Sequence, residues 1–146
     1  MTFEIREVAF GSGEYRAACV LRDEILRRPL GLALGPEDVQ GEDAQWHLLA
    51  FVETSVAGCL LLVPASEGLV KMRQVAIASH FQRTGIGTAL VRRAEGLSRE
   101  RGFSRMVLHA RVTAVPFYER LGYEVEGEGF IEVTVPHRRM IKSLDP

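Results

Sequence analysis

The sequence predicts an α+β fold with a mixed, mostly antiparallel central sheet flanked by helices. Three observations predict it: strand-like segments outnumber helical ones, the expected order is β-α-β-β-β-α-β-α-β-β, and no internal repeat or low-complexity tract interrupts it. The chain has 146 residues, 47% of them apolar and 25% charged, as in soluble globular proteins. We therefore expect one domain spanning residues 1–146.

The first half contributes a strand, a helix and three more strands. Phe3, Ile5 and Val8 alternate with polar residues and predict a half-buried strand that ends at residues 11–13. Residues 14–28 predict a helix, which Pro29 closes. Residues 29–45 are rich in Gly and Pro and predict a loop. Residues 46–52, 56–64 and 69–78 then predict strands, with a tight turn at 53–55.

The second half begins with a helix in which Ile86, Leu90, Ala94 and Leu97 recur at helical spacing, with Gly102 as its stop. Residues 104–110 predict a strand. Residues 113–122 predict a short helix, with Thr113 as N-cap and Gly122 as terminator. Residues 123–144 predict two closing strands, interrupted near 127–129.

Composition excludes several functional classes. The formal net charge is −1, so no global basic field points to nucleic acid. No apolar stretch is long enough to span a bilayer, and the first residues lack the features of a signal peptide, so we expect no membrane partner. Cys19 and Cys59 lie in apolar runs without metal-ligand spacing. Buried free thiols, no metal site and a cytoplasmic location are therefore expected.

The stretch "FQRTGIGTAL" (residues 81–90) combines a strand end, a glycine-rich turn and a helix start. Helix N-termini carry unpaired N–H groups and partial positive charge, and glycines let the backbone approach an anion, so this turn predicts a phosphate site. A Walker loop would need Lys and Ser or Thr after the second glycine, and a dinucleotide fingerprint would need Gly or Ala where Leu90 stands. A structural strand-to-helix turn is the alternative.

Two motifs together resemble the GNAT superfamily of acyl-CoA N-acyltransferases. Gln82-Arg83-Thr84-Gly85-Ile86-Gly87 is similar to that family's pyrophosphate loop, Gln/Arg-x-x-Gly-x-Gly/Ala, and "AVPFYERLGY" (114–123) is similar to its later helix. One helix and one strand separate the motifs, which suits the family. The segments "HAR", "FYERLGY" and "VPHRRM" look most like its ElaA-like bacterial branch.

The resemblance implies acetyl-CoA as the acyl donor. In the family, the strand before the loop bulges and splays from the next strand, and its free backbone groups bind pantetheine and polarise the acyl carbonyl. The corresponding position of a family Asn is Arg111 here, which departs from the pattern. The expected cofactor-binding residues are Val75, Ala76, Ile77, Gln82, Arg83, Thr84, Gly85, Ile86, Gly87, Thr88, Arg111 and Phe117.

The implied reaction is direct attack of a primary amine on the thioester. Tyr118 matches the family's usual general acid, with a core aromatic role as the alternative. His109, at the end of its strand, is the candidate base because histidine changes charge near neutral pH. Glu132, His137 and a water-relayed base are the rivals. A covalent cysteine mechanism is not expected, because neither cysteine has a histidine nearby in sequence.

The acceptor, a small molecule or an exposed amine, is not identified by the sequence. We expect its site between the segments 22–39 and 132–137, across the splayed strands from the loop. A catalytically silent acyl-CoA sensor or protein-interaction module is the alternative function, and a homodimer stays open. The polar residues that could shape the acceptor pocket are Arg22, Arg27, Arg28, Glu37, Asp38, Glu42, Asp43, Trp46 and His47.

Overall fold

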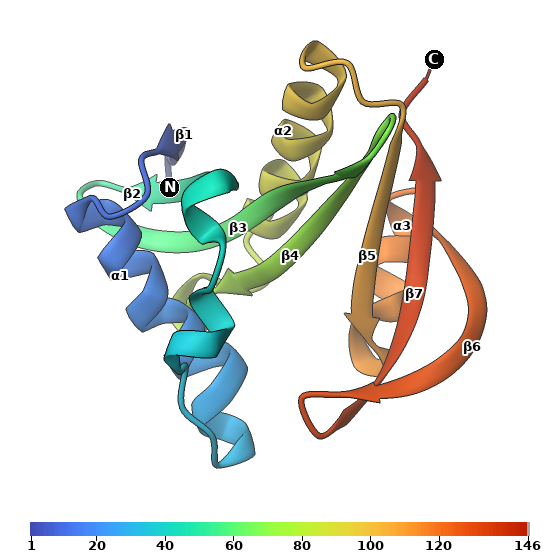
Figure 1. Ribbon diagram of the computed structural model, residues 1–146. Helices are drawn as coiled ribbons and strands as arrows, with labels where there is room; N and C mark the ends of the chain where they lie inside the picture. The colour runs from blue at the N-terminus through green and yellow to red at the C-terminus, as the bar shows by residue number, and fades with distance from the viewer. Residues whose placement is uncertain (146) are drawn as a thin grey trace.

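The computed structural model describes residues 1–145, which form one seven-stranded sheet with helices on both faces (Figure 1). The strand order is β1-β2-β3-β4-β5-β7-β6, and only β4 and β5 are parallel. The predicted mixed, mostly antiparallel sheet is thus confirmed. The elements are β1 (Glu4–Val8), α1 (Gly13–Arg22), β2 (Trp46–Val52), β3 (Ser55–Ser66), β4 (Leu69–Ile77), α2 (Ile86–Glu100), β5 (Arg105–Arg111), α3 (Val115–Arg120), β6 (Glu124–Glu132) and β7 (Val135–Ser143).

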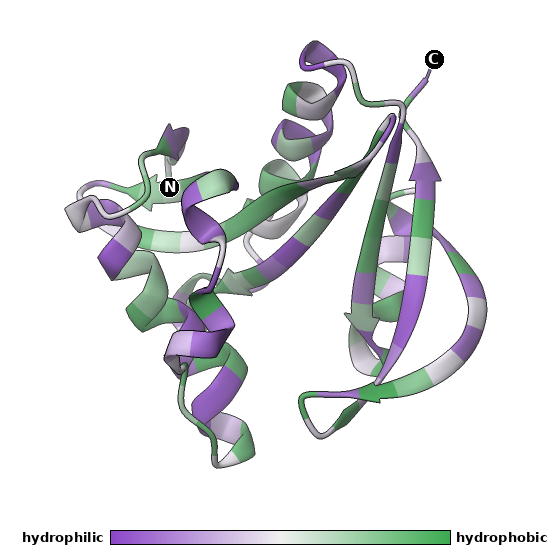
Figure 2. Cartoon of the chain, viewed as in Figure 1, coloured by the Kyte–Doolittle hydropathy of each residue, from purple (hydrophilic) through white to green (hydrophobic). Residues whose placement is uncertain are grey.

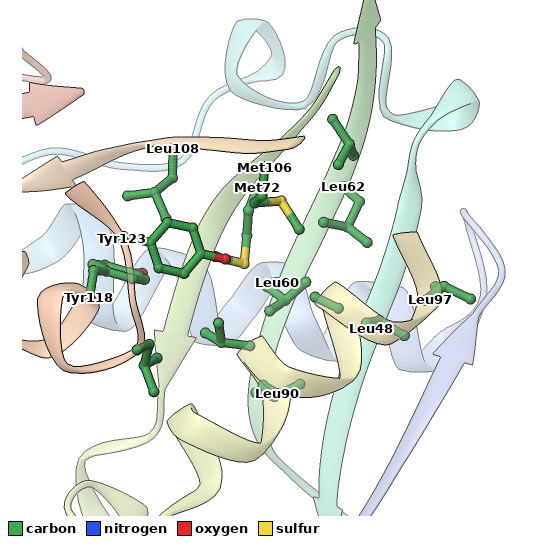
Figure 3. Packing of buried hydrophobic residues seen from close by; sticks show 14 of the residues in the cluster. Leu48, Leu60, Leu62, Met72, Leu90, Leu97, Met106, Leu108, Tyr118 and Tyr123 are labelled. Atoms are coloured by element: carbon green, nitrogen blue, oxygen red, sulfur yellow. The ribbon is translucent and has the colours of Figure 1, made fainter. Parts of the chain in front are cut away.

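The larger apolar core lies between the sheet and the helices α2 and α3 (Figure 3). Ile86, Leu90 and Ala94, the predicted apolar face of α2, are fully buried there. Gly58 on β3 permits this packing, because a Cβ at Gly58 would lie 2.7 Å from Ile77 Cδ1 and 2.9 Å from Leu90 Cδ1. The core fixes α2, and with it the glycine-rich loop at its start.

The opposite face of β2–β4 is covered by α1, whose residues Ala18 and Leu21 pack on Phe51, Cys59 and Ala76. The α-helical hydrogen bonding ends at Arg22, and the chain continues as a π-helical turn, Asp23–Arg27, and a 3₁₀ turn, Arg28–Leu30. The predicted helix 14–28 is therefore present but changes its winding before Pro29. Phe3, expected to face inward, lies ahead of β1 and is 37% exposed.

The helix α3 starts later than expected. A 3₁₀ turn, Val112–Ala114, precedes it, and Ala114 is the N-cap without a side-chain hydrogen bond. Thr113 as N-cap was therefore wrong. Pro116, in the first turn, has no N–H to cap, which lowers the need for such a residue. Gly122, with φ of 96°, ends the helix as predicted.

The predicted interruption near residues 127–129 is a change of register within one curved strand. The pairing of β6 with β7 shifts between Glu126 and Phe130, and Gly127 has a φ of 75°. Figure 1 shows β6 arching away from β7 at this position. The bend returns Phe130 and Glu132 toward β7 at the other end of the hairpin.

Both cysteines are free, as predicted. Cys59 is buried, and burial raises the pKa of its thiol to about 12, so it stays protonated. Cys19 is only half-buried, because its side of α1 borders solvent. Among residues 1–145, no helix has the length and apolar character needed to traverse a membrane.

Candidate active site

The site begins where β4 and β5 part. Their parallel pairing starts at Leu69–Arg105 and ends at Met72–Leu108, after which the strands separate (Figure 1). On its other side, β4 bulges against β3, and Gln74 takes a φ of 57° at the bulge. The backbone of β4 beyond Met72 consequently has no partner strand on the β5 side. The splayed strands expected from the resemblance are present.

A cleft of about 790 Å³ lies at this separation. It is within the usual size range of small-molecule sites, roughly 300–1,000 Å³. The structure brings together in its lining both expected catalytic residues, both rival bases on the closing strands and three of the expected cofactor-binding residues: Tyr118, His109, Glu132, His137, Val75, Gln82 and Arg111. The π-helical turn that continues α1 contributes Ile25, Leu26 and Arg27 to the facing wall.

The bulge of β4 is braced by a buried ion pair. The Arg22 guanidinium donates from both terminal nitrogens to the Glu42 carboxylate at 2.7 Å each, and from Nε to Gln74 Oε1 at 3.3 Å. Tyr15 donates to the same carboxylate at 2.7 Å. Burial alone would raise the pKa of Glu42, but the hydrogen bonds from Arg22 and Tyr15 hold it below its ordinary value.

The acceptor-pocket predictions for Arg22 and Glu42 were therefore wrong, because the two side chains form a buried ion pair with each other and neither lines the cleft. Only Arg27 and Asp38 of that polar set line the cleft, and they pair with each other at 3.2 Å. Arg28 pairs with Asp23 on the surface, and His47 is buried with Nε2 2.8 Å from the Glu42 carbonyl oxygen. Glu37, Asp43 and Trp46 also lie outside the lining.

The glycine-rich loop leads from the cleft to the start of α2. Gln82 lies at the cleft and donates to the Ile77 carbonyl oxygen at 3.0 Å. Arg83 and Gly85 have positive φ, 64° and 91°, and Gly85 is the N-cap of α2. The first N–H groups of a helix have no intrahelical acceptor, so this turn offers donors to an anion.

The other loop residues divide between solvent and core. Arg83, Thr84, Gly85 and Thr88 are exposed, whereas Ile86 and Ala76 are buried. Phe117 packs beside the loop, because a Cβ at Gly87 would lie 3.5 Å from Phe117 Cζ. None of these residues lines the cleft, and because the side chains of Ala76 and Ile86 are buried, these two residues could meet a ligand only through their backbone.

Tyr118 reaches the cleft from the α3 side of the sheet. Its ring contacts that of Phe117, with the centroids 5.0 Å apart. It also contacts that of Tyr123, with the centroids 5.8 Å apart (Figure 3). Only 7% of Tyr118 is exposed, and burial raises the pKa of its phenol well above the ordinary value. Within residues 1–145 no protein group hydrogen-bonds its hydroxyl, which leaves that proton available to a ligand.

His109 lies on the face of the sheet opposite α3, beside the carboxylate of Glu132. Its Nδ1 is 2.9 Å from Glu132 Oε1 and 3.4 Å from Lys71 Nζ. An ionised carboxylate only accepts hydrogen bonds, so Nδ1 carries the proton and the Lys71 contact is not the hydrogen bond. The Nε2 lone pair of the neutral ring is then free. Phe130 packs edge-on against this ring, at a centroid distance of 4.9 Å.

Glu132 is shared between basic neighbours. Burial by itself would raise the pKa of Glu132, but the hydrogen bond and charge of His109 and the charges of His137 and Lys71 hold it below the ordinary range. His137 Nε2 lies 3.8 Å from Glu132 Oε2, and its Nδ1 donates to the Val135 carbonyl oxygen at 2.8 Å. Glu132 is therefore a carboxylate at neutral pH.

Arg111 connects the end of β5 to the first helix. Its guanidinium donates to the Leu26 carbonyl oxygen at 2.7 Å, across the cleft wall. Burial and the charge of Arg27 lower its pKa, although an arginine stays charged under such conditions. The side chain thus borders both the splayed strand and the acceptor side.

Lys71, Arg73 and Gln74 also line the cleft and were not singled out in the sequence. A signal for the first two was present, because they alternate with Met72, whose side chain is in the core. Figure 2 shows β4 as alternating hydrophilic and hydrophobic bands. Gln74 had no such signal, since its role follows from the bulge.

Comparisons with known proteins show the family to which the chain belongs. The family model described as "Acetyltransferase (GNAT) family" matches residues 18–123. The uncharacterized N-acetyltransferase YjcF of Bacillus subtilis is 30% identical over 136 residues, covering 92% of this chain and 96% of that protein. A shorter match, to the B. subtilis protein YyaT, is 30% identical over 74 residues and spans about half of each chain (51% and 50%).

Solved structures give the same fold. A Lactobacillus plantarum protein named as a putative N-acetyltransferase superposes with a TM-score of 0.88 at 25% identity, over 99% of each chain. Escherichia coli ElaA gives 0.83 at 16% identity, over 97% of this chain and 99% of its own, and shares the fold. An aminoglycoside 6'-N-acetyltransferase complexed with coenzyme A gives 0.78 at 16%, over 98% of both. On the family match across most of its length, this chain belongs to the GNAT acetyltransferase family.

Proposed function

We propose that this protein transfers an acetyl group from acetyl-CoA to a primary amine in the cleft between β4 and β5. One observation carries the proposal. Where the two strands part, Tyr118 reaches the cleft from the α3 side and the His109–Glu132 pair reaches it from the other face. A proton donor and a proton acceptor thus flank one opening, as acyl transfer to an amine requires.

The residues present fit acetyl-CoA as a substrate. The β4 backbone at Val75–Ile77 has no partner on the β5 side, and such free N–H and C=O groups can bond the amides of a pantetheine arm. The turn Arg83–Thr88 offers helix N-terminal donors for the pyrophosphate. One protein of the same fold is complexed with coenzyme A, which supports an acyl-CoA as the donor here.

The His109 pair would prepare the acceptor. With Nδ1–H donating to Glu132, His109 Nε2 can accept a proton from the acceptor's ammonium or, through water, from the amine as it attacks. Glu132 stabilises the resulting imidazolium. Lys71 and His137 are rivals for this role, because both line the same cleft. Burial lowers the pKa of Lys71, which favours its neutral form.

Tyr118 would complete the reaction. The new bond joins the amine nitrogen to the acyl carbon, the carbon–sulfur bond breaks, and the Tyr118 hydroxyl gives its proton to the departing thiolate. Its raised pKa keeps the phenol protonated at neutral pH, as a general acid must be. Proton exchange with solvent then restores both side chains.

A thiol-release assay with acetyl-CoA and a panel of primary amines tests the proposal. Turnover with any amine supports an enzyme, whereas tight CoA binding without turnover across the panel would favour a silent sensor. In an active pair, Tyr118→Phe removes the hydroxyl and keeps the ring, so kcat should fall by about 10²–10⁴-fold. Affinity for CoA, measured by calorimetry, should be unchanged.

Tyr123→Phe is the matched control. It removes another buried hydroxyl, which donates to Glu95 at 2.8 Å outside the cleft. That change should lower the free energy of unfolding by about 1–3 kcal/mol and preserve kcat. If Tyr118→Phe turns over like the wild type while chemistry limits the rate, Tyr118 is not the acid.

A further inference from the structure

The charges that line the cleft do not balance. With histidines neutral, the lining holds four cations and two anions: Arg27, Lys71, Arg73 and Arg111 against Asp38 and Glu132. Asp38 is taken by Arg27, at 3.2 Å. Glu132 faces His109 and Lys71. Arg73 and Arg111 therefore remain without a carboxylate among the residues that the structure describes.

Like charges also crowd one another in this cleft. Burial lowers the pKa of Lys71, the Glu132 charge opposes that effect, and the charges of Arg73 and Arg139 lower it further. Arg139 has its own partner outside the lining, Glu126 at 2.8 Å. Burying several cations together is costly unless an anion joins them. The cleft thus has the electrostatic character of an anion-binding site.

The register places Arg73 beside the proposed base. Met72 and Leu108 are the last paired residues of β4 and β5, so Arg73 and His109 are the next residue on each strand as the gap opens. Both point away from the α2 side, where Met72 and Leu108 are buried. Arg111 is two residues farther along β5, on the same face.

We propose that the acceptor is a small amine that carries a carboxylate close to its amino group, as an α-amino acid does. Arg73, which lines the same cleft as Arg111, holds the carboxylate, while Glu132 and His109 face the amine. This rests on the proposed acetyl transfer and adds the substrate class. The acidic residues of segment 37–43 do not favour a purely cationic acceptor instead, since only Asp38 of that segment lines the cleft and Arg27 neutralises it.

The first test compares matched acceptors in the thiol-release assay: amino acids, their amides and the corresponding amines without the carboxylate, with phosphoethanolamine and ethanolamine as the phosphate arm. A charge-assisted hydrogen bond predicts that kcat/KM for the carboxylate-bearing amine exceeds that for its neutral partner by about tenfold or more. Equal or better use of the neutral amines, or a preference confined to the phosphate arm, would overturn the proposal.

Variants assign the preference to a residue. Arg73→Gln should reduce the ratio of the two kcat/KM values to near one, and Arg73→Lys should restore part of it. Arg28→Gln removes an arginine that pairs with Asp23 on the surface, outside the cleft, and should keep the ratio. A ratio that survives Arg73→Gln in a folded protein places the carboxylate elsewhere and contradicts the assignment.

A binding measurement separates this inference from the reaction itself. In CoA-saturated protein, an N-acetylated amino acid should bind about tenfold or more tightly than its amide by calorimetry, and Arg73→Gln should abolish the difference. If this holds while no amine releases thiol, the anion subsite stands and the proposed transfer fails. If thiol is released but the carboxylate has no effect on binding or turnover, the transfer stands and this inference fails.

Discussion

At the scale of single residues, the proposed proton transfer depends on one contact, His109 Nδ1 to Glu132 Oε1 at 2.9 Å. The carboxylate fixes which ring nitrogen carries the proton and so leaves Nε2 as the acceptor. Phe130 and the register of β6 against β7 hold that carboxylate over β5. A geometric relation among three strands therefore decides the chemistry of one side chain.

This relation makes a pH-dependent prediction. A reaction that needs a neutral imidazole loses activity on the acid side, where the ring carries a second proton. His109→Gln should lower kcat/KM by about 10²–10⁴-fold and remove that acid limb, with CoA affinity retained. His80→Gln, on an exposed turn outside the cleft, is the control and should keep the profile. If His137→Gln or Lys71→Met removes the limb instead, the base is the residue replaced.

The roles of residues that belong to a motif were predictable from the sequence. The roles of residues that depend on a partner distant in sequence were not. Tyr118 and Gln82 were placed by "FYERLGY" and by the loop pattern, and both reach the cleft. Arg22 and Glu42 looked like pocket residues because each belongs to a group of like charges in the N-terminal half of the sequence. They are 20 positions apart and find each other only in the fold. No local pattern shows that a charge is already paired.

At the scale of elements, the loop before α2 contains two glycines, Gly85 and Gly87, with different structural roles. Gly85 has a φ of 91°, which side chains adopt only with strain, whereas Gly87 lies in the helix beside Phe117 and Ile77. A Cβ at Gly87 would be in ordinary contact, 3.5 Å from Phe117 Cζ and 3.7 Å from Ile77 Cγ1. The fold therefore does not require glycine at position 87, and the space left by the missing side chain is available to a ligand.

The prediction is that bulk at position 87 weakens CoA binding without unfolding the protein. Gly87→Val should reduce CoA affinity by about tenfold or more, because the added methyls displace the pyrophosphate from one or two N–H donors. Gly87→Ala fits the family pattern Gly/Ala and should bind CoA as the wild type does. Calorimetry gives the affinities, and thermal unfolding checks the fold. Wild-type affinity in folded Gly87→Val would place the pyrophosphate elsewhere.

Most elements were predictable because each has its own hydrophobic pattern: β2 is an almost continuous apolar run, polar and apolar residues alternate over Val70–Arg73 of β4, and apolar residues recur every three or four residues in α2. The details that hydrophobic periodicity does not show are those set by neighbouring elements, and of these the bulge of β4 was expected only from the family resemblance. The π-helical turn at Asp23–Arg27 and the bulge at Gln74 change hydrogen bonding without a change of hydrophobic pattern. Both details lie at the cleft, so local sequence predicted the scaffold better than the geometry of the site.

At the scale of the whole molecule, the sheet has two parts joined by four residue pairs between β4 and β5. Beyond this join, the first helix reaches across from the β1–β4 part. Arg111 donates to the Leu26 carbonyl oxygen, and Arg22 holds Gln74 at the bulge. The cleft is therefore shaped by the same contacts that bind the first helix to the sheet.

The buried Arg22–Glu42 pair allows stability to be separated from the shape of the site. Glu42→Gln leaves the Arg22 guanidinium buried without its counter-charge and should cost about 3–5 kcal/mol of unfolding free energy. Because the folded pKa of Glu42 is lowered, its contribution is present above the unfolded value of about 4.3 and is lost as pH falls through the folded pKa. Urea unfolding at pH 7 and pH 4 should therefore show a smaller pH effect in Glu42→Gln than in the wild type.

The double variant Arg22→Met, Glu42→Leu tests whether the ion pair also shapes the site. Replacing both partners with apolar residues removes the uncompensated charge, so the free energy of unfolding should stay within about 2 kcal/mol of the wild type at pH 7. The variant nevertheless lacks the donor that holds Gln74 Oε1, so the bulge loses its brace. We expect a stable protein with weaker acetyl-CoA binding and lower kcat/KM. If the double variant is stable and binds acetyl-CoA as the wild type does, the ion pair serves stability alone and the bulge is held by β3.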